Sequence, residues 1–188
     1  MSTSVIQQLR RIVPRRPLTP DEAQRVAELQ ATKLILLTGK GHESAIPTAV
    51  ITDLPRVRVL ELPGYFASGS TRWKAGAWQI TLNAPDAPTR RRFSLGHEFK
   101  HALDHPFIGF LYPSIGFLSS RDRAEQAADH FAACLWMPAV RVRQHWDAGL
   151  RDARLLARLF GVSPAAMRVR LTVLGYLPGA CRHDQRAA

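Results

Sequence analysis

The sequence predicts an α+β fold, in which a small antiparallel sheet of about three strands packs against several helices. Three observations support this fold class. A capped amphipathic helix is expected over residues 19–39, short β-prone segments follow at 57–63 and 78–83, and most of the later chain has apolar residues at helical spacing. Elements of both kinds in this order are typical of an α+β domain.

The first long helix has clear signals at both ends. Thr19 is a good N-cap, Pro20 occupies the first helical position, and Glu22 completes a capping box. Gly39 suits the left-handed conformation with which many helices end. Residues 1–18, ahead of this helix, are basic and interrupted by prolines, so we expect either a poorly ordered lead or one short helix.

A second helix is expected over residues 90–105, with Thr89 as a candidate cap and Pro106 at its end. The segment 106–120 that follows is apolar and contains two glycines and two prolines, of which Pro106 is the first, so it is predicted to be a loop.

The last part of the chain is predicted to be helical. Residues 120–138 form a helix that Ser120 can cap and Pro138 stops. Over residues 150–179 the order is helix, glycine turn, serine cap followed by proline, and helix, which resembles a helix-turn-helix pattern. We therefore divide the chain into a lead over 1–18, a main domain over 19–140 and a C-terminal helical segment over 141–188.

Composition limits the environment and the partners. The 188 residues are 46% hydrophobic, which is enough for a core, and the sequence has no apolar run of about 18 residues that would span a membrane. The N-terminus lacks the features of a secretory signal, and the two cysteines, Cys134 and Cys181, do not suggest a disulfide framework. We therefore expect a cytoplasmic protein without a membrane partner. The formal net charge of +11 fits either nucleic-acid contact or a solvated arginine-rich surface.

The stretch "FSLGHEFKHALDHP", residues 93–106, contains the pattern H-E-x-x-H. His97 and His101 are four residues apart, so on a helix both imidazoles emerge from one face, about 6 Å apart along the axis. This spacing suits one zinc ion held by two nitrogens. Glu98 is then placed to act as the general base for a zinc-bound water. The alternative interpretation is a histidine-rich amphipathic helix whose imidazoles form local hydrogen bonds.

Catalytic zinc takes three protein ligands and leaves one position for water. The helix over 120–138 offers Glu125, with Asp129 one turn later on the same side. Glu125 is the expected third ligand, and Asp129 can accept a hydrogen bond from the outer nitrogen of a ligand histidine. His105 lies about 12 Å along the helix axis from His97, so we expect it at the helix end or beside the cleft and not as a ligand.

At these two motifs the sequence resembles the ImmA/IrrE family of zinc peptidases. The family has a phenylalanine shortly before H-E-x-x-H and a second pattern, E-x-x-A-(N/D)-x-F-A-x-x-L-(L/W)-M-P. The residues of this chain that match the second pattern are Glu125, Ala128, Asp129, Phe131, Ala132, Leu135, Met137 and Pro138. The resemblance runs from about residue 19 to 178. Lys100 departs from it, because many members have a small residue there, and a lysine that reached the cleft would alter substrate preference.

The resemblance implies a gluzincin-like site with one Zn²⁺ per chain, held by His97, His101 and Glu125, with Glu98 as the catalytic base. It also implies zincin-type active-site helices beside the sheet. Cleavage of a regulatory protein is expected, typically a helix-turn-helix repressor or an antitoxin-like DNA-binding protein. In peptidases of this kind an edge strand pairs with the substrate backbone, and Trp78–Asn83 is the candidate strand, although it can equally be sheet core.

Two other interpretations remain open at this stage. A non-catalytic regulator on the same fold would bind DNA or a repressor through the basic C-terminal helices, which carry Arg154, Arg158, Arg168 and Arg170. A toxin–antitoxin component would have its cleft closed by a partner. For the peptidase, a second donor to the developing oxyanion is expected among His105, Tyr112 and His130, and sequence does not choose between them.

Overall fold

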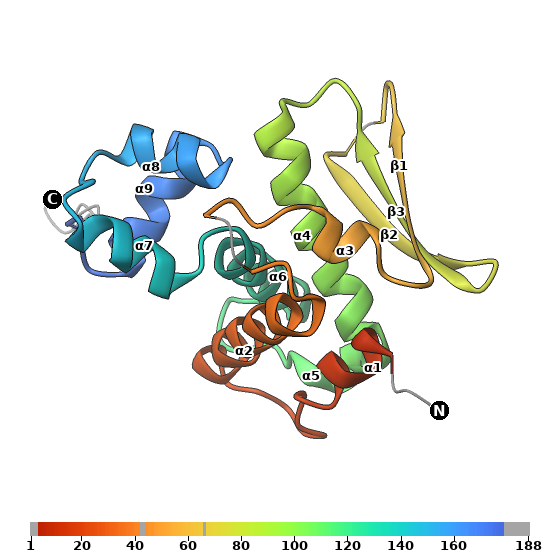
Figure 1. The fold of residues 1–188 in the computed structure, drawn as a ribbon. Helices are drawn as coiled ribbons and strands as arrows, with labels where there is room; N and C mark the ends of the chain where they lie inside the picture. The colour runs from red at the N-terminus through yellow and green to blue at the C-terminus, as the bar shows by residue number, and fades with distance from the viewer. Residues whose placement is uncertain (1–3, 42–43, 66, 179–188) are drawn as a thin grey trace, which may run out of the picture.

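The computed structural model describes residues 4–41, 44–65 and 67–178 of the chain (Figure 1). It confirms the α+β class. The elements in chain order are α1 (Val5–Arg10), α2 (Pro20–Thr38), α3 (Ala49–Thr52), β1 (Val57–Leu62), β2 (Gly69–Lys74), β3 (Ala77–Asn83), α4 (Pro88–Asp104), the 3₁₀ turn η1 (His105–Phe107), α5 (Ile108–Leu111), α6 (Ser120–Trp136), α7 (Ala139–Asp147), α8 (Ala153–Phe160) and α9 (Pro164–Val173).

The sheet contains the three predicted strands, but it is mixed and not wholly antiparallel. Its order is β1-β3-β2, with β2 antiparallel and β1 parallel to β3. A two-residue turn at Ala75 and Gly76, both with positive φ, joins β2 to β3 as a hairpin. Strand β3 therefore lies in the middle, opposite in direction to β2 and in the same direction as β1.

The helix signals are partly confirmed. The capping box of Thr19 and Glu22 is present at α2, and Gly39 ends this helix with φ 65°. Thr89 is not a cap, because α4 begins at Pro88, two residues earlier than expected, and has no side-chain cap. At α6 the capping serine is Ser119 and not Ser120, since Ser119 forms a capping box with Asp122.

The segment predicted as an apolar loop is only partly irregular. It begins with η1 and the short helix α5, and an isolated bridge between Ile115 and Leu118 closes a turn further along. Leu111 and the neighbouring Tyr112 are buried in a small cluster beside α2 and α6. Some apolar residues of this segment are therefore buried, and others are exposed on the surface. The loop prediction, which was based on the glycines and prolines, missed the two short helical turns in its first half.

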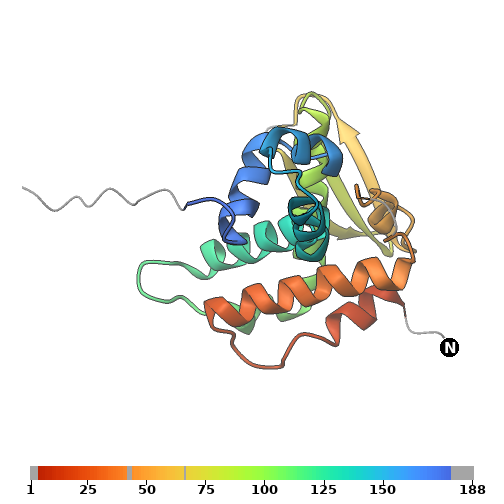
Figure 2. The same cartoon turned by 60° about the vertical axis from the view of Figure 1, so that its left-hand side comes forward.

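Three long helices and the sheet surround one core. Helix α4 packs against the sheet on one side and against α6 on the other, and α2 lies alongside α6 (Figures 1 and 2). The main core cluster contains Ile6 and Leu9 from α1 as well as Phe160 and Leu171 from the C-terminal helices. The predicted lead and the C-terminal segment thus both contribute to the core that supports α4 and α6.

Helix α1 also holds the C-terminal end of α4. The Arg10 guanidinium donates hydrogen bonds to the carbonyls of Ala102 and Leu103, at 2.8 and 3.1 Å. Carbonyls in the last turn of a helix have no partner within the helix, and a cation there also complements the helix dipole. The short helix in the lead therefore stabilises the end of the helix that carries H-E-x-x-H.

No helix in the described parts of the chain is long and apolar enough to cross a membrane. Cys134 is a buried free thiol. Cys181 lies outside the described residues, so the absence of a disulfide remains a prediction.

A buried polar network joins α4 to the segment after it. Lys100 is fully buried, and its ammonium donates to both carboxylate oxygens of Asp104 at 2.6 Å and to the Tyr112 hydroxyl at 3.2 Å. Tyr112 in turn donates to Asp104. Burial lowers the pKa of Lys100, while Asp104 acts in the opposite direction. The three groups satisfy one another, which is the condition for burying charge without a large penalty.

We expect Lys100→Met to lower the free energy of unfolding by about 3–5 kcal/mol, because it leaves the Asp104 carboxylate buried without its cation. Lys100→Met combined with Asp104→Leu should lose less than the single variant, since no unpaired charge remains. Chemical denaturation measures both. Lys74→Met, at an exposed position, is the control and should stay within about 0.5 kcal/mol of the parent. A single variant as stable as this control would contradict the prediction.

Candidate metal centre

Close packing of α4 on α6 brings the two sequence motifs together. Gly96 directly precedes His97 and faces α6, where a Cβ at position 96 would lie 2.7 Å from Trp136 Nε1 and 3.2 Å from the Ala132 Cβ. Only glycine fits such an approach without displacing the neighbouring helix. The contact therefore sets the separation between the histidine helix and the helix that carries Glu125.

The three predicted ligands converge. His97 Nε2 lies 3.0 Å from His101 Nε2 and 3.1 Å from Glu125 Oε2, and His101 Nε2 lies 3.6 Å from Glu125 Oε1. Among the described residues, these three are the group whose ligand atoms could hold a metal ion, all within 4.8 Å of one another. Each side chain is partly accessible. The arrangement leaves a triangle of donors that faces solvent on one side.

The donor geometry fits zinc. A tetrahedral ion with bonds of about 2.0–2.1 Å has ligand atoms about 3.3 Å apart. The three separations in the structure, 3.0, 3.1 and 3.6 Å, bracket this value. Two imidazole nitrogens and one carboxylate oxygen are also the donor set of many catalytic zinc sites, in which a fourth position stays open. The Nε2 atoms of His97 and His101 face each other at 3.0 Å, so both can lie within bonding distance of one ion.

Asp129 orients the first histidine. Its Oδ1 lies 2.8 Å from His97 Nδ1, so the outer nitrogen carries the proton and Nε2 points toward the other donors. Burial opposes protonation of His97, but the hydrogen bond and charge of Asp129, together with the charges of Glu98 and Glu125, outweigh it and raise the pKa of His97. At His101, burial and the nearby His97 lower the pKa.

Glu98 occupies a different face of α4, toward the sheet. It is buried, and the start of β2 covers it so closely that a Cβ on Gly69 would lie 2.8 Å from Glu98 Cγ and 3.0 Å from Oε1. Burial raises the pKa of Glu98 to about 7; His97 acts against this rise and Glu125 adds to it. A carboxyl group with a pKa near neutrality is suited to accept a proton and return it.

The other predicted site residues lie elsewhere. His105 is exposed at the end of α4, where its ring meets the edge of Trp78 at a centroid distance of 5.1 Å. Tyr112 is enclosed with Lys100 and Asp104, so it cannot donate to a group in the cleft. His130 is partly buried, and burial followed by the charge of Arg170 lowers its pKa. None of the three is part of the ligand triangle.

Two sequence interpretations need correction. Trp78–Asn83 lies in β3, the central strand, whose two edges are paired with β1 and β2. It cannot take up an extended peptide, and β2 is the edge strand next to Glu98. Lys100 does not reach the cleft, because its side chain points into the protein and is fully buried. A lysine at this position, where many family members have a small residue, therefore changes the packing inside the protein and does not line the cleft.

Gly69 and Gly96 lie against the candidate site, and neither was expected there from the sequence. Each makes room for a site side chain or its helix, and neither carries chemistry of its own. For Gly96 the sequence has a signal, a glycine inside an otherwise regular helix, whereas Gly69 is the first residue of its strand.

The fold and the site together define an α+β protein with a candidate metal centre at the packed faces of two helices. Residues 56–172 match the family model of the peptidase M78 family, described as the IrrE N-terminal-like domain. This is more than half of the chain, so the protein belongs to that family, as the motifs had indicated.

The other comparisons describe the fold. A solved structure titled "Mycobacterium tuberculosis transcriptional regulator" is similar, with a TM-score of 0.61 and 19% sequence identity over 98% of this chain and 55% of that chain. The present chain thus spans about half the length of that regulator. No curated protein was found to match the chain.

We expect one zinc ion per chain, and we expect Glu125→Ala to reduce zinc affinity far more than His105→Ala. Glu125 is one of three converging donors, whereas His105 contacts Trp78. Asp129→Ala should be intermediate, with a loss of about 10–100-fold, as is typical of residues that orient a ligand histidine. Competitive titration with a chelating indicator measures all three. If His105→Ala lost more affinity than Glu125→Ala, the metal would have to be held within α4 and its turn.

Proposed function

We propose that this protein is a zinc-dependent endopeptidase that cleaves a regulatory protein. One observation carries the proposal: the donor atoms of His97, His101 and Glu125 converge beside a buried Glu98 whose pKa is raised to about 7. A histidine-rich surface helix has no need for a third donor from a second helix, or for a buried carboxyl group beside the donors. Membership of a peptidase family supports the same reaction class.

In this proposal His97, His101 and Glu125 hold the ion. Zinc, when bound, supplies a Lewis acid that polarises the scissile carbonyl and makes a water molecule easier to deprotonate. Glu98 accepts the proton of the attacking water and later delivers it to the leaving amine. Burial against Gly69 keeps the Glu98 carboxylate out of bulk water, and Asp129 keeps His97 in the tautomer that presents Nε2.

The edge of β2 is the proposed docking site for the substrate backbone. On the described part of the sheet, β2 is bonded only to β3, so its other edge is available for an added strand. Its first residue, Gly69, touches Glu98. A peptide aligned on this edge would pass the catalytic carboxylate, and its backbone hydrogen bonds would position the scissile bond without requiring a particular sequence.

A helix-turn-helix repressor or antitoxin is the proposed substrate, in a cytoplasmic setting. The fold similarity to a protein titled a transcriptional regulator is consistent with a regulatory role. The alternative, a regulator that binds DNA without cleavage, draws on Arg154, Arg158 and Arg168, which are exposed on α8 and α9. Arg170 is buried and does not belong to that surface. Salt-dependent DNA binding that persists after zinc removal would favour the alternative.

Glu98→Gln should retain zinc and lose cleavage by at least about 10²–10⁴-fold, because the amide cannot accept the proton of water while the ligands are untouched. The parent and the variant are produced in the source cells, and new protein N-termini are mapped by mass spectrometry. Glu61→Gln, on β1, serves as the matched control. Equal cleavage of the same substrates by parent and Glu98→Gln, at equal zinc content, would exclude Glu98 as the base.

Gly69→Val should also lower turnover while zinc affinity stays near that of the parent. The new Cβ would stand 2.8 Å from Glu98 Cγ, so the carboxylate must move, whereas the three ligands lie on other faces. Turnover is measured on a substrate found in the preceding experiment. Thr71→Val on the same strand is the control, since the Thr71 hydroxyl is buried without a hydrogen-bond partner among the described residues. Unchanged turnover of Gly69→Val would show that β2 does not position Glu98.

A further inference from the structure

A buried cation in the C-terminal part lacks a counter-ion. Arg170, on α9, is 3% exposed, and its Nε donates to the Met137 carbonyl at 3.0 Å. Within the described part of the chain its Nη2 has no hydrogen-bond partner, and no carboxylate lies within 4.0 Å of the guanidinium. A buried charge without a partner is costly, so such a group usually has a ligand or a partner that compensates it.

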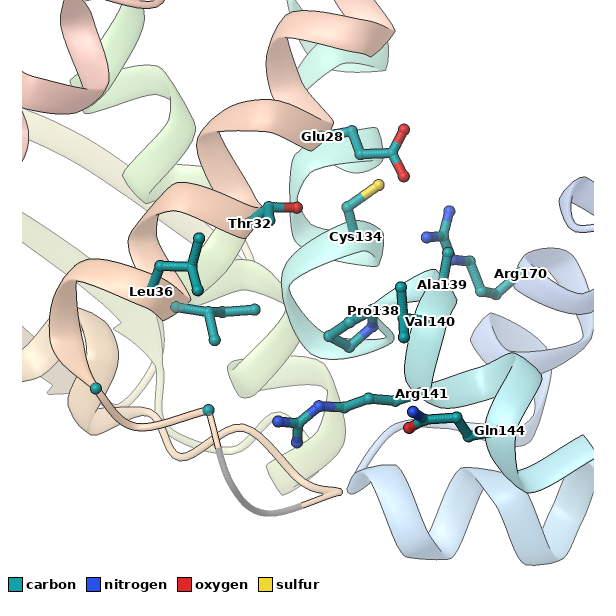
Figure 3. Close-up of a pocket in the computed structure, with 13 residues that line it drawn as sticks. Glu28, Thr32, Leu36, Cys134, Pro138, Ala139, Val140, Arg141, Gln144 and Arg170 are labelled. Atoms are coloured by element: carbon teal, nitrogen blue, oxygen red, sulfur yellow. The ribbon is translucent and has the colours of Figure 1, made fainter. Parts of the chain in front are cut away.

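Arg170 lines a groove between α2, α6, α7 and α9. The cavity has a volume of about 540 Å³, within the range of about 300–1,000 Å³ for small-molecule sites. Figure 3 shows the Arg170 guanidinium reaching from α9 toward Cys134 on α6, with Glu28 of α2 at the same end. This cavity is separate from the metal centre, because none of the three ligand residues lines it.

The remainder of the groove is mostly apolar. Leu36 from α2 and Pro138 and Val140 from the start of α7 form its walls, and Leu36 and Val140 are 70% and 64% exposed. Arg141 lies at the end away from Arg170 (Figure 3). Arg141 also has no carboxylate within 4.0 Å in the residues that the structure describes. The lining therefore offers two guanidinium groups that form no ion pair within the described residues, one acidic residue and an apolar surface between the ends.

We propose that this groove binds a small aliphatic carboxylate, whose head group pairs with Arg170 and whose chain lies along Leu36, Pro138 and Val140. The charge of the lining selects an anion over a cation or a neutral amphiphile. A planar guanidinium matches a carboxylate in two hydrogen bonds, which favours this head group. An aliphatic chain is expected because, when bound along the exposed apolar side chains of the groove, it would remove them and itself from water.

The binding site does not depend on the proposed peptidase activity, and its test needs no substrate. Octanoate is the probe, with octanol and octyltrimethylammonium as neutral and cationic analogues of the same chain length. Binding to the zinc-supplemented full-length protein is measured by calorimetry, and thermal unfolding is followed in parallel. Octanoate is expected to bind and to raise the unfolding temperature, while the two analogues bind at least ten-fold more weakly.

Two variants locate the site. Arg170→Gln, which removes the charge, should weaken octanoate binding at least ten-fold, whereas Arg168→Gln, the same change at an exposed position on the same helix, should leave it unchanged. Val140→Trp fills the groove from an exposed position and should weaken binding without affecting folding. If Arg170→Gln fails to fold, the loss or retention of octanoate binding by Val140→Trp tests whether the groove is the binding site. Absence of octanoate binding to the parent, equal binding of octanol, or full binding by both groove variants would overturn the proposal.

Discussion

The candidate metal centre depends on one contact, the close approach of α4 to α6 at Gly96. The glycine faces the Trp136 indole and Ala132 at distances that exclude any side chain. Glu125 comes from a different helix than the two histidines, so its carboxylate reaches them only if the helices are this close. The Arg92 guanidinium carbon also lies 4.2 Å from the centroid of the Trp136 ring, so two residues of α4, one turn apart, contact the same tryptophan.

Helix α4 serves three neighbours because its residues are about 100° apart around the axis. His97 and His101 lie on the face toward Glu125, Glu98 lies toward β2, and Lys100 lies toward Tyr112. The polar groups on the three faces are in different environments and have different roles. The histidines stay partly accessible and can bind a ligand, Glu98 is buried enough to shift its pKa, and Lys100 is enclosed and only stabilises. A rotation of α4 by one residue would exchange these environments, and the packing of Gly96 and Gly69 opposes such a rotation.

Local signals in the sequence predicted the long helices and the placement of two histidines on one helix face, because both depend on nearby residues. The capping box at Thr19, the stop at Gly39 and the helical spacing of His97 and His101 all act within a few positions. Strand order was not predictable in this way. From the sequence, Trp78–Asn83 suits an edge strand and a central strand equally well. It is central because β1 pairs with it, and the paired residues of the two strands are 21 positions apart in the sequence. The burial of Lys100 likewise depends on Tyr112, which lies in a segment that was expected to be a loop.

The C-terminal helices belong to the support of the metal centre as well as to the groove. Arg170 lines two cavities, the groove and a second one of about 360 Å³ to which Asp129 and His130 contribute. Asp129, on α6, accepts a hydrogen bond from the outer nitrogen of His97, and Arg170 donates to the carbonyl of Met137, the C-cap residue of the same helix. Arg170 therefore contacts the C-terminal end of α6 while it lines both cavities. Glu125 lies in the N-terminal half of α6, so this one helix carries a residue of the candidate metal centre and, at its other end, residues that line the groove.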